Sequence, residues 1–184
     1  MDVYNNKKNF QLFVAQTGQF IDSLDSVRRI TTNVIRKSYR LTYLDMIWSA
    51  LSEEDAGTLL SLCWTDSENA NLDANVSLDT IIGYFNEIPK KYLMTTEEIR
   101  EYEALEDKIT VYRGIGSKSN KEGLSWTINK DVALWFSRRF SDSGGCVIRG
   151  LADKSSVLAY YKRRNEYEVV INPDDVLNKK ILDE

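Results

Sequence analysis

The sequence contains no histidine among its 184 residues. This absence removes the Ser-His-Asp triad, the Cys-His pair and any histidine general base from the chemistry available to the chain. Only two cysteines are present, Cys63 and Cys146, and they lie far apart. Sparse cysteine is typical of a reducing compartment, and without histidine or paired cysteines we expect no metal site. Acid–base chemistry must come from Asp, Glu, Lys, Tyr or Cys.

Long apolar runs are missing as well. The N-terminal "MDVYNNKKNF" has no apolar core of the kind that a secretory signal carries, and no run of roughly eighteen apolar residues occurs. The sequence therefore predicts no membrane segment and a cytoplasmic location in the producing or infected cell. The formal net charge of −4 argues against binding nucleic acid over the whole surface, although a local basic patch stays compatible with it.

Length and composition suit one globular domain with a real core, since 42% of the 184 residues are hydrophobic. No internal repeat and no linker rich in proline and glycine divides the chain, which has only two prolines. We therefore expect a single domain over residues 1–184. It has a helical N-terminal part at 1–107 and a β-rich catalytic core at 108–184.

The N-terminal part carries helix signals. Serine or threonine followed by acidic residues predicts helix starts at Ser52, at Ser77 and at Thr95 or Thr96. Pro89 ends the helix that starts after Ser77. Basic residues cluster ahead of these helices and do not recur until residue 90; two interpretations stay open, solvated helix faces or a face that binds a partner or substrate. The cluster comprises Arg28, Arg29, Arg36, Lys37 and Arg40.

After about residue 108 the pattern changes to short β-like runs. "KITVYRGIG", "GLSWT", "CVIRGLA", "SVLAYY" and "YEVVI" combine β-branched and aromatic residues, and turn residues separate them. "NKDVALWFSRRF" predicts one internal helix, capped by Asn129. Helices followed by strands place the chain in the α+β class.

The segment "RRNEYEVVI", residues 163–171, begins a predicted strand with two glutamates. Alternation along a strand would place Glu166 and Glu168 on one face and Tyr167 on the other. Taken alone, such a pair is most often a solvated strand edge.

Four segments stand out in order: Tyr112-Arg113-Gly114, Ser125-Trp126-Thr127, Phe136 with Arg139, and Glu166-Tyr167-Glu168. Together they resemble the mono-ADP-ribosyltransferase family, in the branch with the Arg–Ser–Glu signature. "NEYEVVINP" is most similar to the Glu-x-Glu segment in the enzymatic components of iota-type binary toxins. The resemblance covers roughly residues 108–176. It implies helices packed on two small antiparallel or mixed sheets around a cleft for NAD, which is a substrate. Trp126 departs from the family, which has Thr or Ser there.

The resemblance implies a role for each residue of the NAD site. Glu168 would stabilise the positive charge that develops on the ribose as nicotinamide leaves. Ser125 would orient Glu168, and Thr127 would support the same strand. Arg113 would hold phosphate or ribose oxygens with its planar guanidinium, and Gly114 would let the backbone approach the nicotinamide.

The remaining implied roles concern the nicotinamide ring and the pyrophosphate of NAD, and the acceptor of ADP-ribose. Phe136 would stack on the nicotinamide ring and Arg139 would meet the pyrophosphate. Glu166 would pair with an acceptor guanidinium and take its proton. In the family the upstream loop, here "YYKRRNE", recognises the acceptor, which makes Tyr160, Tyr161 and Arg164 candidates for target recognition. Because residues 162–164 are basic, they favour an acidic target surface or nucleic acid, with a solvated turn as the plainer interpretation.

The leading hypothesis is an ADP-ribosyltransferase that uses NAD to modify a target protein at arginine. Modification of a nucleic acid or a small molecule is an alternative within the same fold, and NAD glycohydrolysis, with water as acceptor, is another. A fourth hypothesis is an interaction module that keeps the fold without the chemistry. A phage or bacterial effector, or a toxin, is the expected setting.

Overall fold

The computed structural model describes residues 24–67, 70, 75–116, 122–139 and 145–182. The chain forms two compact units, Met1–Leu93 and Met94–Glu184, which we call the helical unit and the sheet unit. The single domain expected over residues 1–184 stays a prediction beside this division. The change from helix to strand does fall near residue 107, but the sheet unit begins earlier and includes the helix that ends at Glu103.

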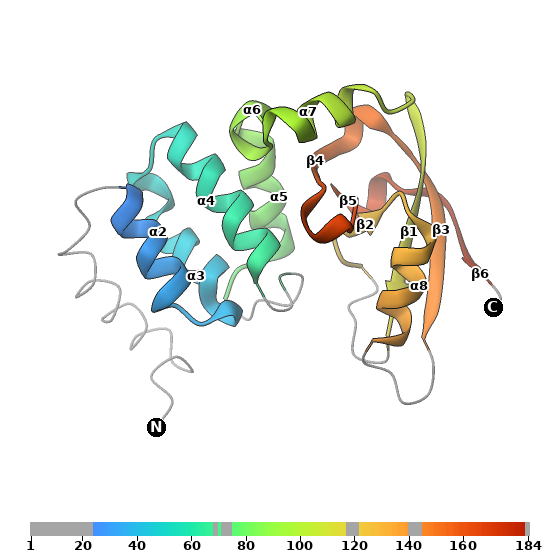
Figure 1. Cartoon of the computed structure of the whole chain (residues 1–184), viewed down its shortest axis with the longest axis horizontal. Coiled ribbons are helices and arrows are strands. Elements are labelled where there is room, and N and C mark those ends of the chain that lie inside the picture. Colours follow the sequence, from blue (N-terminus) through green and yellow to red (C-terminus); the bar gives the residue numbers. More distant parts are fainter. Residues whose placement is uncertain (1–23, 68–69, 71–74, 117–121, 140–144, 183–184) are drawn as a thin grey trace. The chain divides into compact units, whose positions relative to one another are not determined.

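The helical unit consists of short helices (Figure 1), and the hydrophobic side chains buried in it are aliphatic and aromatic. Ser52 and Ser77 cap two of them as predicted, because each side-chain hydroxyl accepts a hydrogen bond from the backbone three residues on. Trp64 and Phe85 meet edge to face in the core, with ring centroids 5.6 Å apart. The α-helices described here are α2 (Leu24–Asn33), α3 (Arg40–Ile47), α4 (Glu53–Asp66), α5 (Leu78–Glu87) and α6 (Lys90–Leu93).

Part of the basic cluster is structural. Arg40 is buried, and its guanidinium donates to the Asp66 carboxylate, to the Asp66 carbonyl (3.2 Å) and to the Thr32 carbonyl (3.0 Å). Lys37 pairs with the same carboxylate at 3.1 Å. Partial burial acts to raise the pKa of Asp66, but the hydrogen bonds from Lys37 and Arg40 outweigh it and the pKa is lowered. Arg40 thus serves the fold and is not part of an open binding face.

Asp66→Asn is expected to destabilise the helical unit by about 2 kcal/mol at neutral pH, because it leaves the buried Arg40 without its countercharge. A lowered folded-state pKa contributes stability above the unfolded pKa that is lost as pH falls through the folded value. Urea unfolding should therefore show less acid dependence in Asp66→Asn than in the wild type. Lys37→Gln, which removes only the exposed partner, is the matched control and should cost less. Equal losses in both variants would contradict this account.

The sheet unit is built on one antiparallel sheet of six strands in the order β4-β5-β2-β1-β3-β6. The α+β class is confirmed, but the expectation of two separate sheets is wrong for the described residues. The reason lies in one register pair, Tyr112 opposite Thr127, which joins β2 to β1 and so links two three-stranded halves. The strands are β1 (Lys108–Ile115), β2 (Ser125–Thr127), β3 (Cys146–Asp153), β4 (Val157–Tyr161), β5 (Glu168–Ile171) and β6 (Leu177–Leu182).

Two helices complete the sheet unit. α7 (Thr96–Glu103) begins with a capping box in which Thr95 and Glu98 bond each other's backbone, so Thr95 is the cap. α8 (Lys130–Arg138) begins at Asn129, as predicted, and packs on β1 and β3 (Figure 1). No pattern in the sequence predicts β6, because most of that edge strand is exposed and lacks alternation. Within the described part of the chain, no helix is long and apolar enough to cross a membrane.

Candidate active site

Three neighbouring strands bring together the residues that the sequence singled out. In the order β5-β2-β1, Glu168 begins β5, Ser125 begins β2 and Arg113 lies near the end of β1. Antiparallel pairing sets Thr127 opposite Glu168, which places the Ser125 side chain diagonally across from it on the same face. We call Arg113, Ser125 and Glu168 the Arg–Ser–Glu set.

Hydrogen bonds connect all three members of this set. The Ser125 hydroxyl donates to Oε1 of Glu168, and Nη1 of Arg113 donates to the backbone carbonyl of Ser125. The serine thus orients the carboxylate, while the arginine fixes the strand that carries the serine. Ser125 and Glu168 are both half-buried.

Arg113 is a buried cation, only 7% exposed. Burial lowers its pKa to about 10, and the nearby Glu168 and then Glu122 act in the opposite direction. The guanidinium is therefore charged at neutral pH. Glu122 is an addition to the site that the sequence did not single out, because it belongs to no recognised motif and its relation to Arg113 is tertiary. A buried cation with carboxylates nearby is costly to build and is typical of functional sites.

Thr127 supports the turn that leads into β5. Its hydroxyl donates to the Glu166 carbonyl (2.7 Å) and accepts from the Asn129 backbone (3.0 Å). It therefore links β2 to the start of α8 and to the Glu-x-Glu segment. Trp126, between the two hydroxyl residues, is buried and donates from Nε1 to the Gly123 carbonyl at 3.2 Å. The departure from the family's sequence thus lies in the core of the sheet unit.

Glu166 does not share a strand face with Glu168, so the alternation predicted from the sequence is wrong. β5 begins at Glu168, and Glu166 has helical backbone angles (φ −83°, ψ −18°) after a short 3-10 helix, Arg163–Asn165. Tyr167 lies between the two glutamates in the left-handed region, with φ 48°. A turn therefore sets the direction of the Glu166 side chain. Arg164 (φ 58°) and Asn165 (φ 57°) are left-handed too, a costly conformation that concentrates at functional sites.

The chain's own Arg164 binds Glu166. Nε of Arg164 lies 3.0 Å from Oε1 of Glu166, and Nη2 donates to Oε2 at 3.2 Å. The pair is bidentate, as a carboxylate and a guanidinium prefer. The Arg164 side chain is 62% exposed and that of Glu166 is 19% exposed. Glu166 thus holds a guanidinium in this structure, and the guanidinium comes from the chain itself.

Helix α7 anchors the other end of the same loop. The Lys162 ammonium pairs with Glu101 (2.5 Å) and Glu97 (3.2 Å), and the Lys162 backbone donates to the buried Glu98 at 3.1 Å. These contacts raise the pKa of Lys162 and lower that of Glu101. Since Lys162 and Arg164 both have carboxylate partners within the chain, the loop offers less free positive charge than its sequence suggested.

Tyr160 and Tyr161 cannot contact a target surface, and their assignment to target recognition is corrected. They are 2% and 0% exposed at the end of β4, where every residue is buried. The Tyr160 hydroxyl donates to Glu101 at 3.1 Å, and burial raises the pKa of that hydroxyl. The β-like run "SVLAYY" already predicted that both tyrosines end a strand, and β4 confirms it, whereas the resemblance had also counted them in the loop "YYKRRNE".

Gly114 makes room for α8, while its predicted role beside nicotinamide stays a prediction. A Cβ at Gly114 would lie 1.9 Å from the Ala133 carbonyl oxygen and 2.7 Å from the Ser137 nitrogen. The space that this glycine opens is therefore filled by the helix backbone. Because neighbours on a strand point to opposite faces, Arg113 points away from α8.

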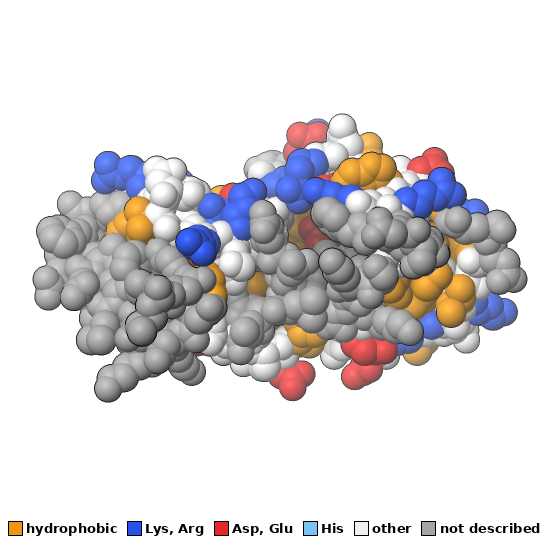
Figure 2. Space-filling view, turned by 90° about the horizontal axis from the view of Figure 1, so that it is seen from below, with side chains coloured by type: hydrophobic (Ala, Val, Ile, Leu, Met, Phe, Trp, Pro, Cys, Tyr) orange, Lys and Arg blue, Asp and Glu red, His pale blue; other side chains and the backbone are white. Residues whose placement is uncertain are grey.

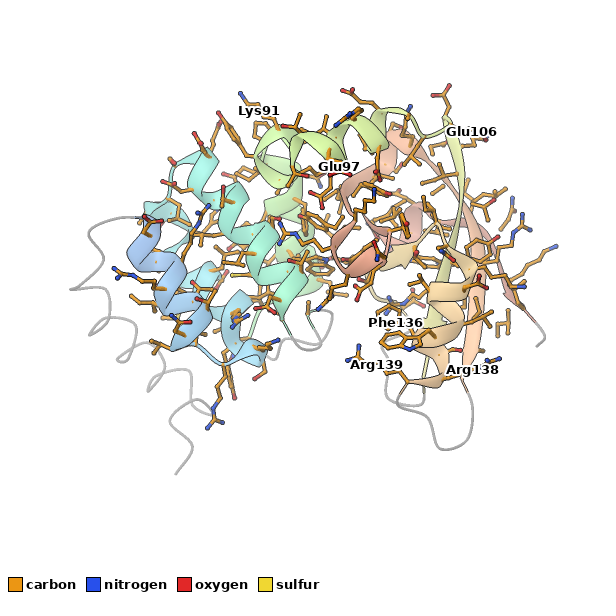
Figure 3. All side chains as sticks on the ribbon, in the orientation of Figure 1. Lys91, Glu97, Glu106, Phe136, Arg138 and Arg139 are labelled. Carbon is orange, nitrogen blue, oxygen red and sulfur yellow. The ribbon has the colours of Figure 1, made fainter. Side chains whose placement is uncertain are left out.

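Phe136 and Arg139 lie at the C-terminal end of α8. In Figure 3 both point to one side of the helix, and Arg138 points to the other. Arg139 stacks over the Trp135 ring at 4.7 Å, and Phe136 meets that ring edge-on at 4.9 Å. Trp135, which is 54% exposed, is thus a further member of this group. Hydrophobic side chains are visible on the surface of the sheet unit in Figure 2.

A surface pocket in the sheet unit lies apart from this chemistry. Leu105, Lys108, Thr110 and Ile128 are among its lining residues, and none of the lining residues belongs to the Arg–Ser–Glu set.

In the parts of the chain that the structure describes, no group of three or more His, Cys, Asp or Glu side chains is placed to hold a metal ion. Comparison with protein-family models, with curated proteins and with solved structures found no match.

Proposed function

We propose that the chain is a mono-ADP-ribosyltransferase that cleaves NAD and transfers ADP-ribose to an arginine of a target protein. One observation carries the proposal: Arg113, Ser125 and Glu168 come from three separate segments and lie on adjacent strands. The Ser125 hydroxyl donates a hydrogen bond to Glu168, and Arg113 donates one to the Ser125 backbone carbonyl. The motif resemblance named the same three residues from their order alone. A decayed, purely structural member of the fold would have no need to keep this buried cation and oriented carboxylate.

The chemistry follows from the charges. Loss of nicotinamide leaves positive charge on the ribose, and the Glu168 carboxylate, held in place by Ser125, stabilises it. The Arg113 guanidinium is charged and fixed, and it suits phosphate or ribose oxygens of NAD. Phe136 and Arg139 remain candidates for the nicotinamide ring and the pyrophosphate.

The arginine acceptor is supported by Glu166. Its carboxylate already takes a guanidinium in bidentate geometry, so it is able to seat an acceptor arginine and receive its proton. The intramolecular pairing of Lys162 weakens the argument from a basic loop for a nucleic-acid acceptor. A protein target with an accessible arginine is therefore the preferred partner.

The test separates cleavage from transfer. With labelled NAD and agmatine, a small guanidine, the purified chain should release nicotinamide and form ADP-ribosyl-agmatine. Glu166→Ala should lower the transfer product by at least about tenfold, because the acceptor loses its countercharge, and should leave nicotinamide release largely intact. Equal loss of both products would contradict the role given to Glu166, and no nicotinamide release under any condition would overturn the proposed function.

NAD hydrolysis is the second candidate, and one observation favours it. Glu166 is already ion-paired with Arg164, whereas the Arg–Ser–Glu set does not depend on Glu166. Water reaching the ribose would then yield free ADP-ribose. This outcome appears in the same assay as nicotinamide release without ADP-ribosyl-agmatine.

A further inference from the structure

The ion pair between Arg164 and Glu166 places a guanidinium of this chain where an acceptor arginine is expected. Both carboxylate oxygens of Glu166 are engaged, by Nε at 3.0 Å and by Nη2 at 3.2 Å. Glu166 is two residues from Glu168, and the turn between them is fixed by the bonds from Thr127 to the Glu166 carbonyl and from the Ile128 backbone to the Tyr167 carbonyl. The Arg164 guanidinium is thus bound to Glu166, two residues before Glu168, the carboxylate that would face the ribose.

Backbone strain and anchoring both hold Arg164 in this position. Arg164 has a left-handed backbone conformation that few non-glycine residues adopt, and Asn165, a residue type that tolerates it, follows in the same region. Lys162, two residues before Arg164, is tied to α7 through its ammonium and its backbone. The neighbouring Arg163 serves as a contrast. It is also exposed, but its guanidinium lies over the Tyr161 ring at 5.6 Å. Of these two adjacent arginines, Arg164 pairs with Glu166, whereas Arg163 lies over the Tyr161 ring.

The geometry points to Arg164 as an acceptor of ADP-ribose within its own chain, an inference that rests on the proposed function. In this step the bond from ribose C1′ to the nicotinamide nitrogen breaks, and its electron pair leaves with nicotinamide. A guanidine nitrogen of Arg164 forms the new bond to C1′, and the proton that it loses passes to Glu166. NAD supplies the whole transferred group, so no other reactant is required.

Modification at this position would also limit the enzyme. The guanidinium keeps its charge, but it then carries a bulky group with two phosphates beside Glu166. Target arginines would meet an occupied site. Before modification, an external acceptor has only to displace an exposed ion pair, which changes its apparent affinity by on the order of fivefold or less. Self-modification would thus be a one-time event that closes the acceptor site.

The experiment uses the full chain and NAD without another acceptor. We expect a burst of one nicotinamide per chain, with peptide mass spectrometry placing one ADP-ribose unit on Arg164. The burst rate constant should not depend on protein concentration, because the transfer is intramolecular. Arg164→Lys should lose the burst and the adduct, and Arg163→Lys should retain the adduct on Arg164. A Glu168→Gln chain mixed with the wild type should stay unmodified.

Each failure has a distinct meaning. Nicotinamide release with no adduct on Arg164, or with an adduct only elsewhere, would overturn this inference and leave the proposed function standing. Modification of the Glu168→Gln chain in the mixture would show transfer between chains and would overturn the intramolecular step. Absence of nicotinamide release, with agmatine present as well, would remove both the inference and the proposed function.

Discussion

Glu168→Gln is expected to lower the rate of nicotinamide release by about a thousandfold while the sheet unit keeps its fold. Glutamine has nearly the same shape, and its amide oxygen can still accept the hydrogen bond that the Ser125 hydroxyl gives to Glu168. What is lost is the negative charge that opposes the charge developing on the ribose. Because that charge exists only in the transition state, the loss should appear in kcat, with KM for NAD changed little.

Two companion variants separate the possible causes of this loss. Glu122→Gln removes the other carboxylate that supports the charge on Arg113, and Glu122 is exposed. It should lower kcat by less than about tenfold, since Glu122 only tunes Arg113. Ser125→Ala removes an orienting hydrogen bond but no charge, so a loss of about ten- to a hundredfold is expected. The measurement is nicotinamide release under saturating NAD, with thermal unfolding of each variant alongside.

The ranking of these variants is the decisive outcome. If Glu168→Gln and Glu122→Gln lose activity equally, Glu168 acts through the charge state of Arg113 and does not face the ribose. If Glu168→Gln keeps full activity, the Arg–Ser–Glu set is a structural cluster and the proposed enzyme is wrong.

The sequence could predict those elements of the fold that depend on residues close together in the chain. The caps at Ser52, Ser77, Thr95 and Asn129 depend on hydrogen bonds within three residues, and the structure shows each of them. The main strands of the sheet unit follow from β-branched and aromatic runs in the same way. The α+β class needs no more than these elements in their order.

What the sequence missed depends on contacts between distant segments or on backbone angles. The left-handed backbone at Tyr167 breaks the alternation that "NEYEVVI" suggests. Asn165 is a residue type that tolerates a positive φ, but a tyrosine gives no such signal. Tyr160 is buried in β4, which packs against α7, and its hydroxyl donates to Glu101 of that helix. Arg164 was predicted to face a target, yet its guanidinium meets Glu166 of its own loop. Tertiary packing decides the burial of Tyr160, whereas backbone angles within the loop decide the turn at Tyr167 and the pairing of Arg164 with Glu166.

Gly114 is a further example, because a glycine after an arginine at a strand end suggests access for a ligand, whereas the structure gives the space to α8. Gly114→Ala is therefore expected to destabilise the sheet unit by about 3 kcal/mol or more. The added Cβ would lie 1.9 Å from the Ala133 carbonyl oxygen and 2.9 Å from its carbonyl carbon. Helix and strand backbone must shift to relieve this clash, since no flexible side chain is available to move. Arg113 is the adjacent residue, so nicotinamide release should fall as well.

Gly83→Ala is the matched control for this substitution. Gly83 lies in the middle of α5, is exposed, and has nothing within 4 Å of an added Cβ. The same chemical change there should stabilise the helical unit by about 0.5–1 kcal/mol, because alanine favours the helix. Denaturant unfolding should thus move in opposite directions for the two variants. A Gly114→Ala chain as stable as the wild type would mean that α8 does not rest on β1, although Thr127 is hydrogen-bonded to Asn129 at the start of that helix.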